Sequence, residues 1–304
     1  MKWSKINKEV KMIEKENFYL LAATFFWALG LIIGKFCSAE MPPMTLTFIR
    51  YLLAGIGMGV IHFFKEKEFK IDINDVLYIF ILAFLGIVLN GVLFFKGIGM
   101  TSPINTSIIS STTPVIVCII GVLFFKEKVD IKNIISMISS VIGILILLTN
   151  GNIESLTKIR INRGDLIILG AIISNGIYII GSKKVLKKYS PTKILTYLFF
   201  FTALILLPSI YIERNMYVID EISVKAIVSL LYMGIFSSLI AFLLQQKGIK
   251  KIGPVKAAVY TNLIPIYSII LSALILDEKV TIIQITAMLL VMFAIMINMK
   301  KRLD

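Results

Sequence analysis

The chain has 304 residues, of which 58% are apolar and only 16% are charged, and its formal net charge is +14. Ordinary soluble domains carry about 25% charged residues, so this composition excludes a soluble protein and predicts an all-α membrane protein. Its two cysteines, Cys37 and Cys118, lie at or within apolar runs, which excludes a disulfide framework and a cysteine metal site.

Ten apolar runs are long enough to be membrane helices, since a bilayer core needs roughly 20 residues per helix. In chain order they are Phe18–Phe36, Thr45–Phe64, Asp75–Phe95, Ile104–Phe125, Ile131–Thr149, Asp165–Gly181, Ile194–Ile212, Val224–Gln245, Lys256–Leu276 and Ile282–Met299. A polar leader at 1–17 precedes them and a short tail at 300–304 follows. The gaps between runs are short, so we expect the function to lie within the bundle.

The runs form two related halves, because a long stretch of the first half recurs 151 residues later. The matching residues are Lys96-Gly97-Ile98 with Lys247-Gly248-Ile249, Pro103 with Pro254, Pro114 with Pro265, and Glu127-Lys128-Val129 with Glu278-Lys279-Val280. We therefore predict a five-helix repeat at 18–149, an external linker at 150–163 and a second five-helix repeat at 164–299. Five is odd, so the repeats enter the membrane from opposite sides. Inverted repeats of this kind permit alternating access.

The basic residues predict the orientation of the chain. Most Lys and Arg residues fall in the leader, in the tail and in the loops that would lie on the same side as both. The positive-inside rule places both termini in the cytoplasm. Because the charges are divided among short loops, the net charge reports topology and predicts no nucleic-acid partner.

Several motifs resemble those of the drug/metabolite transporter superfamily, EamA type, over nearly the whole chain. They are Trp27-Ala28-Leu29-Gly30 with Lys35, Phe48-Ile49-Arg50-Tyr51-Leu52-Leu53-Ala54, and the doubled proline pattern that ends in Glu-Lys. The resemblance implies ten helices, with helices 1, 3, 4, 6, 8 and 9 around a central cavity, and transport of small metabolites, often amino acids. The chain departs from the family at Asn175-Gly176, where relatives carry an aromatic residue, so their substrates do not transfer.

Few polar side chains lie inside the apolar runs, and each must face protein or water because lipid cannot satisfy it. We assign to a substrate pathway Trp27, Arg50, Asn90, Ser174, Asn175, Tyr178, Ser238, Gln245, Tyr260 and Asn262. The alternative is that they only join helices by hydrogen bonds, worth about 0.6 kcal/mol on average. As a set they favour a pathway.

Two of these residues have specific alternatives. Trp27 lies well inside the first run, away from the interfacial belt, so it either lines a cavity or fills the core. Arg50 lies roughly 9 Å along the second run from Met44. It either binds a carboxylate or serves structure, by snorkelling or by capping carbonyl groups.

Pro114 and Pro265 fall in the middle of the fourth and ninth runs. Each removes a backbone donor and frees the carbonyl four residues earlier, at Ser110 and Thr261. We expect a kink at both prolines. The kinks curve the helices around a cavity or serve as gates.

The sequence contains no HExxH, GxSxG or Gly-rich phosphate motif, so we predict no enzyme activity, cofactor or metal. The predicted function is transport of a small metabolite, an amino acid or similar, across the inner membrane of a bacterium by alternating access, as an exporter or a facilitator. A multidrug or nucleoside carrier, and a receptor or scaffold without transport, stay open as alternatives. The expected partners are the substrate and the lipid bilayer; the oligomeric state, including a monomer, is left open.

Acidic residues are confined to loops, to the two ends of the chain or to within about a turn of a helix end. A buried central carboxylate is the usual proton carrier in a membrane transporter. We therefore expect facilitated diffusion or solute exchange rather than proton antiport through a core acid.

The topology gives the first testable prediction. Reporter fusions at Asp304 and after Lys70 should be cytoplasmic, because the basic residues hold those segments inside, and a fusion near Ile153 should be external. Alkaline phosphatase and fluorescent-protein activities of the fusions measure this. A cytoplasmic Ile153 would overturn the ten-helix scheme.

Overall fold

The computed structural model describes residues 2–66, 68–98, 100–101, 103–152, 162–217, 221–276 and 280–299, and the regular structure of these residues is entirely helical. Of the helices in these ranges, eight are long and apolar enough to cross a bilayer, and two apolar helices are shorter, Thr113–Phe125 and Ile282–Ile297. The prediction of an all-helical protein with many apolar helices is confirmed. Helices predominate because each satisfies its own backbone hydrogen bonds, which lipid cannot do.

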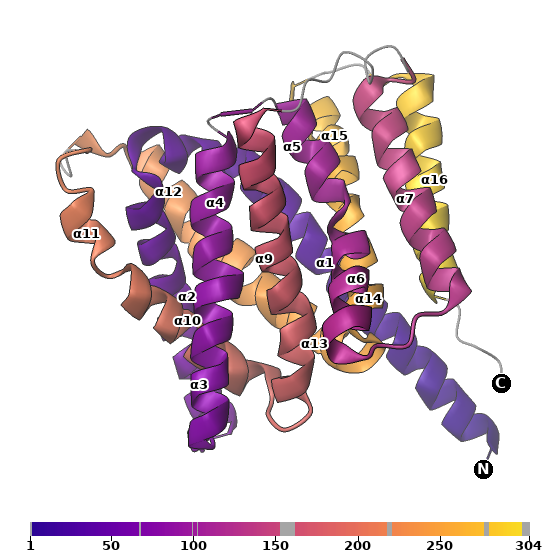
Figure 1. Cartoon of the computed structure of the whole chain (residues 1–304), viewed down its shortest axis with the longest axis horizontal. Helices are drawn as coiled ribbons and strands as arrows, with labels where there is room; N and C mark the ends of the chain where they lie inside the picture. Colours follow the sequence, from indigo (N-terminus) through magenta and orange to yellow (C-terminus); the bar gives the residue numbers. More distant parts are fainter. Residues whose placement is uncertain are drawn as a thin grey trace.

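The first half contains an array of long and interrupted helices (Figure 1). In order they are α1 (Lys2–Glu40), α2 (Pro43–Lys65), α3 (Ile73–Leu82), the π-helical η1 (Ala83–Val88), α4 (Leu89–Ile98), α5 (Pro103–Ser111), α6 (Thr113–Phe125) and α7 (Ile131–Thr149). The linker predicted at 150–163 lies largely outside the described residues.

The second half has a similar order of elements. They are α9 (Arg163–Leu186), α10 (Pro191–Leu206), α11 (Ser209–Ile212), α12 (Val224–Tyr232), the π-helical η3 (Met233–Ile240), α13 (Ala241–Ile252), α14 (Pro254–Val259), the 3-10 helix η4 (Tyr260–Asn262), α15 (Leu263–Leu276) and α16 (Ile282–Met299). The repeated pair Glu278-Lys279 lies outside the described residues.

Prolines account for three interruptions of the predicted runs. The fourth run divides into α5 and α6 at Thr112, two residues before Pro114, and the ninth contains η4 just before Pro265. The seventh run, expected as one helix over Ile194–Ile212, instead ends as α10 at Leu206 and resumes as α11. Pro208 lies between them, and it cannot donate the backbone hydrogen bond that a continuous helix needs.

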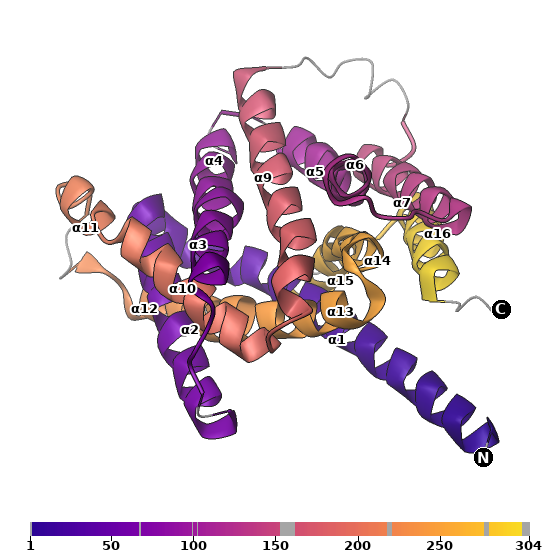
Figure 2. The same ribbon diagram turned by 60° about the horizontal axis from the view of Figure 1, so that its bottom comes forward.

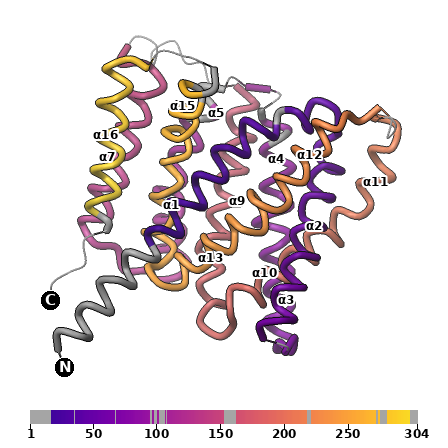
Figure 3. Tube along the Cα trace, turned by 180° about the vertical axis from the view of Figure 1, so that it is seen from behind, coloured from indigo at the N-terminus to yellow at the C-terminus, as the bar shows by residue number. Residues whose placement is uncertain are grey.

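Helices from the two halves alternate in the bundle. α2 packs along α10, and α7 lies beside α16 at one end of the molecule (Figures 1 and 3). α1 crosses the bundle against η3 and α13, whereas α9 packs against η1 and α4 (Figure 2). The first long helix of each half therefore contacts the π-helical segment of the other half.

Close backbone approach at these two contacts depends on glycine. A Cβ atom on Gly86 in η1 would lie 2.4 Å from the Cβ of Tyr178, and one on Gly30 in α1 would lie 2.3 Å from the Oγ of Ser237. Such distances are shorter than any van der Waals contact. The π-helical segments are thus set directly against α9 and α1, and π-bulges of this kind often occur at functional sites.

Two carboxylates fasten α2 to the α10–α11 segment at opposite ends. Buried Glu213 accepts hydrogen bonds from the backbone N–H of Thr45 (2.7 Å) and Met44 (3.2 Å) at the start of α2. At the other end, Glu66 accepts one from the hydroxyl of Thr192 (2.5 Å) at the start of α10. Burial opposes the charged form of Glu66, but hydrogen bonds from Ser190 and Thr192 outweigh it and lower the pKa of that carboxyl.

Candidate functional site

Phe242 of α13 lies where five helices meet in the centre of the bundle. Its ring centroid is 5.6 Å from that of Trp27 (α1), 6.1 Å from Tyr51 (α2), 5.8 Å from Tyr178 (α9) and 5.7 Å from Phe199 (α10). Three of these contacts, with Trp27, Tyr51 and Phe199, are edge-to-face, a favoured geometry for aromatic pairs. We call these five residues the aromatic cluster.

Trp27 is held in the cluster by a specific hydrogen bond. Its indole N–H donates to the backbone carbonyl of Ser237 at 2.8 Å, inside η3. A π-helical turn has a different backbone hydrogen-bond pattern from an α-helix, and a carbonyl within it accepts the hydrogen bond from Trp27. The side chain therefore both fills space and fixes α1 against η3.

Arg50 points into the protein and does not snorkel. Its Nε donates to the hydroxyl of Ser238 at 2.5 Å, and its guanidinium lies 5.3 Å from the ring centroid of Tyr51. No acidic side chain in the described part of the chain forms an ion pair with it. The positive charge thus lies beside the aromatic cluster without an anionic partner.

Two neighbouring glutamines supply amide groups one turn after Phe242. The side-chain amide of Gln246 donates to the hydroxyls of Tyr178 (2.5 Å) and Ser182 (3.0 Å). Gln245 is only 4% exposed. Among the described residues, neither glutamine's buried carbonyl oxygen has a hydrogen-bond partner, and such a group costs about 1–3 kcal/mol if it stays unsatisfied.

The structure brings only part of the predicted set to this place. Trp27, Arg50, Tyr178 and Ser238 contact the aromatic cluster or each other, and Gln245 follows one turn along α13. Asn175 lies half-buried on α9, three residues before Tyr178.

The other predicted pathway residues join helices to one another. Asn90 donates to the carbonyl of Ala171 at 2.8 Å, and Ser174 donates to the carbonyl of Leu85 in η1. The hydroxyl of Tyr260 donates to Asn17 at 2.7 Å, and Asn262 donates to Ser140 at 2.9 Å. These contacts match the structural alternative, in which intramembrane polar groups connect helices.

Sequence reasoning missed Tyr51, Phe199, Phe242 and Gln246. Three are aromatic residues in apolar runs rich in such residues, so nothing in the pattern distinguished them. Gln246 had a usable signal, since it lies one residue beyond a predicted run and its amide is the second of two adjacent glutamines. The run is in fact longer, because α13 continues to Ile252.

At Pro114 the local chemistry follows from the missing donor. The hydroxyl of Thr113 donates to the freed carbonyl of Ser110 at 2.6 Å.

Among the described residues there is no group of three or more histidine, cysteine or acidic side chains arranged to hold a metal ion.

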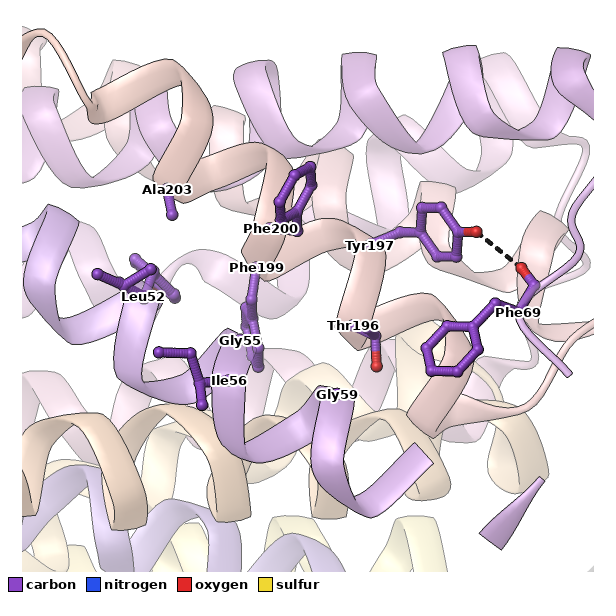
Figure 4. A pocket seen from close by; sticks show the side chains of 11 residues that line it. Leu52, Gly55, Ile56, Gly59, Phe69, Thr196, Tyr197, Phe199, Phe200 and Ala203 are labelled. Carbon is purple, nitrogen blue, oxygen red and sulfur yellow. Dashed lines mark hydrogen bonds between the residues drawn. The ribbon is translucent and has the colours of Figure 1, made fainter. Parts of the chain in front are cut away.

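A second feature lies outside the cluster. An apolar groove of about 340 Å³ runs between α2 and α10, with Phe69 and Tyr197 at one end (Figure 4). Tyr51 and Phe199 belong both to the groove and to the aromatic cluster.

Comparisons with known proteins agree with this architecture. A model of the EamA-like transporter family matches residues 15–149 and 162–300. The chain is 27% identical over 255 residues to the uncharacterized transporter YyaM of Bacillus subtilis, with 83% of each chain covered. It is 23% identical over 287 residues to the uncharacterized transporter YetK of the same organism, covering 93% of this chain and 86% of the relative.

A solved structure described only as a crystal structure of a protein has the same fold. It superimposes with a TM-score of 0.76 at 12% sequence identity, and the match covers 93% of this chain and 96% of the other. At this identity the likeness concerns the fold alone.

The two glutamines give a testable contrast in stability. Gln246→Leu removes an unpartnered carbonyl oxygen but also the donor to two buried hydroxyls, each worth about 1–3 kcal/mol if left unsatisfied, so it should lower stability. Gln245→Leu should leave stability unchanged or raise it, because it removes a buried carbonyl that has no partner. Thermal unfolding of the detergent-solubilised protein measures both, and a larger loss for Gln245→Leu would contradict the assignment.

Proposed function

The chain belongs to the EamA-like transporter family, and we propose that it carries a small metabolite, an amino acid or a similar compound, across the inner membrane of a bacterium by alternating access. Its multiple apolar helices and its relatives make it a multi-pass membrane protein. In the proposed orientation, both termini lie in the cytoplasm.

The observation that carries the substrate class is Arg50, a cation held inside the bundle without an acidic partner among the described residues. Ionisable side chains in such positions usually serve a substrate or ion pathway. A substrate carboxylate would pair with the guanidinium, which recognises carboxylates through two parallel hydrogen bonds. A substrate ammonium would suit the free carbonyl oxygens of Gln245 and Gln246 and the faces of the aromatic rings.

Two pairs of equivalent positions support two inverted five-helix repeats. Trp27 and Tyr178 are 151 positions apart, the same separation as in the sequence repeat, and they contact Phe242 from α1 and α9. Ala83 and Gly234, near the starts of the two π-helical segments, have the same separation. Equivalent elements that pack reciprocally across the halves are what alternating access between two similar states requires.

A second candidate is a carrier of nucleosides or aromatic drugs. The aromatic cluster favours it, since flat rings stack on Trp and Tyr side chains. Arg50 and the carbonyl oxygens of Gln245 and Gln246 favour an amino acid instead, because it carries both a carboxylate and an ammonium group. A flux screen in proteoliposomes with amino acids, nucleosides and cationic drugs separates these classes, and absence of flux for all of them would favour a receptor or scaffold.

Replacing Arg50 tests the role of the cation. Arg50→Met should reduce uptake of a carboxylate-bearing substrate about 10-fold to 100-fold, because a hydrogen bond to a charged group contributes about 1.5–3 kcal/mol. Radiolabelled flux per mole of reconstituted protein is the measurement. Arg214→Met is the matched control, since Arg214 lies over the ring of Tyr211 outside the cluster; equal losses in both variants would refute the assignment.

Energy coupling gives a further prediction. The buried acids Asp75, Asp165 and Glu213 lie near helix ends and accept hydrogen bonds there, so we expect flux to follow the solute gradients. The measurement is accumulation in proteoliposomes with an imposed pH gradient and a clamped membrane potential. Accumulation that follows the pH gradient and collapses with a protonophore would contradict this expectation.

A further inference from the structure

The groove lies on the outer surface of the bundle, between the two apolar helices α2 and α10. Its walls include Leu52, Ile56 and Gly59 from α2 and Thr196 and Phe200 from α10 (Figure 4). Ile56 and Phe200 are each 59% exposed. Since both helices are long and apolar enough to span a bilayer, the groove opens toward lipid.

The size of the groove decides what can occupy it. From Leu52 to Gly59 it extends roughly 10 Å along α2 at 1.5 Å per residue, so a volume of about 340 Å³ corresponds to a cross-section of about 30 Å². A helix with its side chains is about 10 Å across, or roughly 80 Å² in section. A whole helix of a second copy therefore cannot enter the groove, whereas an extended hydrocarbon chain can.

The surroundings limit the contact to the hydrocarbon. The Phe69 ring closes one end, where the hydroxyl of Tyr197 donates to the Phe69 carbonyl at 2.7 Å. Beyond this end the exposed side chains carry both signs, Lys65 and Lys70 as well as Glu68. Headgroup charge is thus a weak determinant, and the acyl chain is the part that the groove recognises.

We propose that this groove binds one acyl chain of a membrane phospholipid, and that the bound chain supports the aromatic cluster from outside. Tyr51 and Phe199 line the groove, and their ring centroids lie 5.5 Å apart. Both rings also contact Phe242, at 6.1 and 5.7 Å. An acyl chain in the groove fills the space into which these two rings would otherwise move, so lipid occupancy sets the shape of the central site.

Gly59 provides a variant that fills the groove without disturbing the helix pair. A Cβ atom there would meet only the Thr196 methyl group at 3.9 Å, an ordinary van der Waals distance. Gly59→Leu therefore places a branched side chain in the space assigned to lipid. Val60→Phe is the matched control, because Val60 is exposed on the same turn of α2 but does not line the groove.

The experiment uses a phospholipid with a photoactivatable acyl chain, reconstituted with the full chain and analysed by peptide mass spectrometry. Labelling should concentrate on the α2 and α10 peptides and fall on the order of tenfold in Gly59→Leu, since each methylene group displaced from apolar contact changes affinity about fourfold. Labelling of α16, which faces lipid elsewhere, should stay constant, and Val60→Phe should behave like the parent protein. Uniform labelling of all exposed helices, unaffected by Gly59→Leu, would overturn the proposal.

A second variant keeps the test decisive if Gly59→Leu folds poorly. Ile56→Phe enlarges a groove side chain that is already mostly exposed, so it should reduce labelling without loss of stability. Native mass spectrometry of the detergent-purified protein gives an independent readout: the parent protein and Val60→Phe should retain one more phospholipid than the groove variants. Equal lipid retention in all four proteins would refute the site, whatever the substrate proves to be.

Discussion

The rest of this structure depends on one constraint, that a backbone carbonyl or N–H released inside an apolar bundle has no water to bind. In three of the irregular segments a backbone carbonyl accepts a hydrogen bond from a side chain. Trp27 donates to Ser237 in η3, Ser174 donates to Leu85 in η1, and Thr113 donates to the carbonyl released by Pro114. In η3 and η1 the donor side chain comes from another helix, so these hydrogen bonds also connect each irregular segment to its neighbour. The candidate site lies where the largest of these irregular segments, η3, meets α1.

This constraint explains which features the sequence could predict. Long apolar runs predict helices, and prolines predict interruptions, because both follow from local chemistry. The π-helical segments contain no proline, and a single glycine in each, Gly86 and Gly234, does not mark a π-helical turn, so their positions depend on packing against α9 and α1. Polar type alone could not separate Asn90 and Ser174, which join helices, from Arg50 and Gln245, which lie near the aromatic cluster. The central position of Phe242 could not be predicted either, because nothing distinguishes one apolar residue in an apolar run from its neighbours.

The α2–α10 helix pair is held together by hydrogen bonds at both of its ends. Glu213 binds the first turn of α2, and Glu66 binds the first turn of α10 at the other end, so each half supplies a carboxylate to a helix of the other. A carboxylate at a helix N-terminus satisfies free N–H groups and favours the helix dipole. The hydrogen bonds between the two halves at both ends hold α2 and α10 together.

The placement of charged residues bears on the transport mechanism that we propose. Glu213 accepts hydrogen bonds from Met44 and Thr45 at the start of α2, so this acid has a structural role. Arg50, in contrast, lies beside the aromatic cluster, and its Nε donates to a neutral hydroxyl, that of Ser238. Moving a bare guanidinium between two environments of low polarity is costly. In the carrier proposed above, a bound carboxylate would remove most of that cost in both states, so the substrate itself would lower the barrier between them.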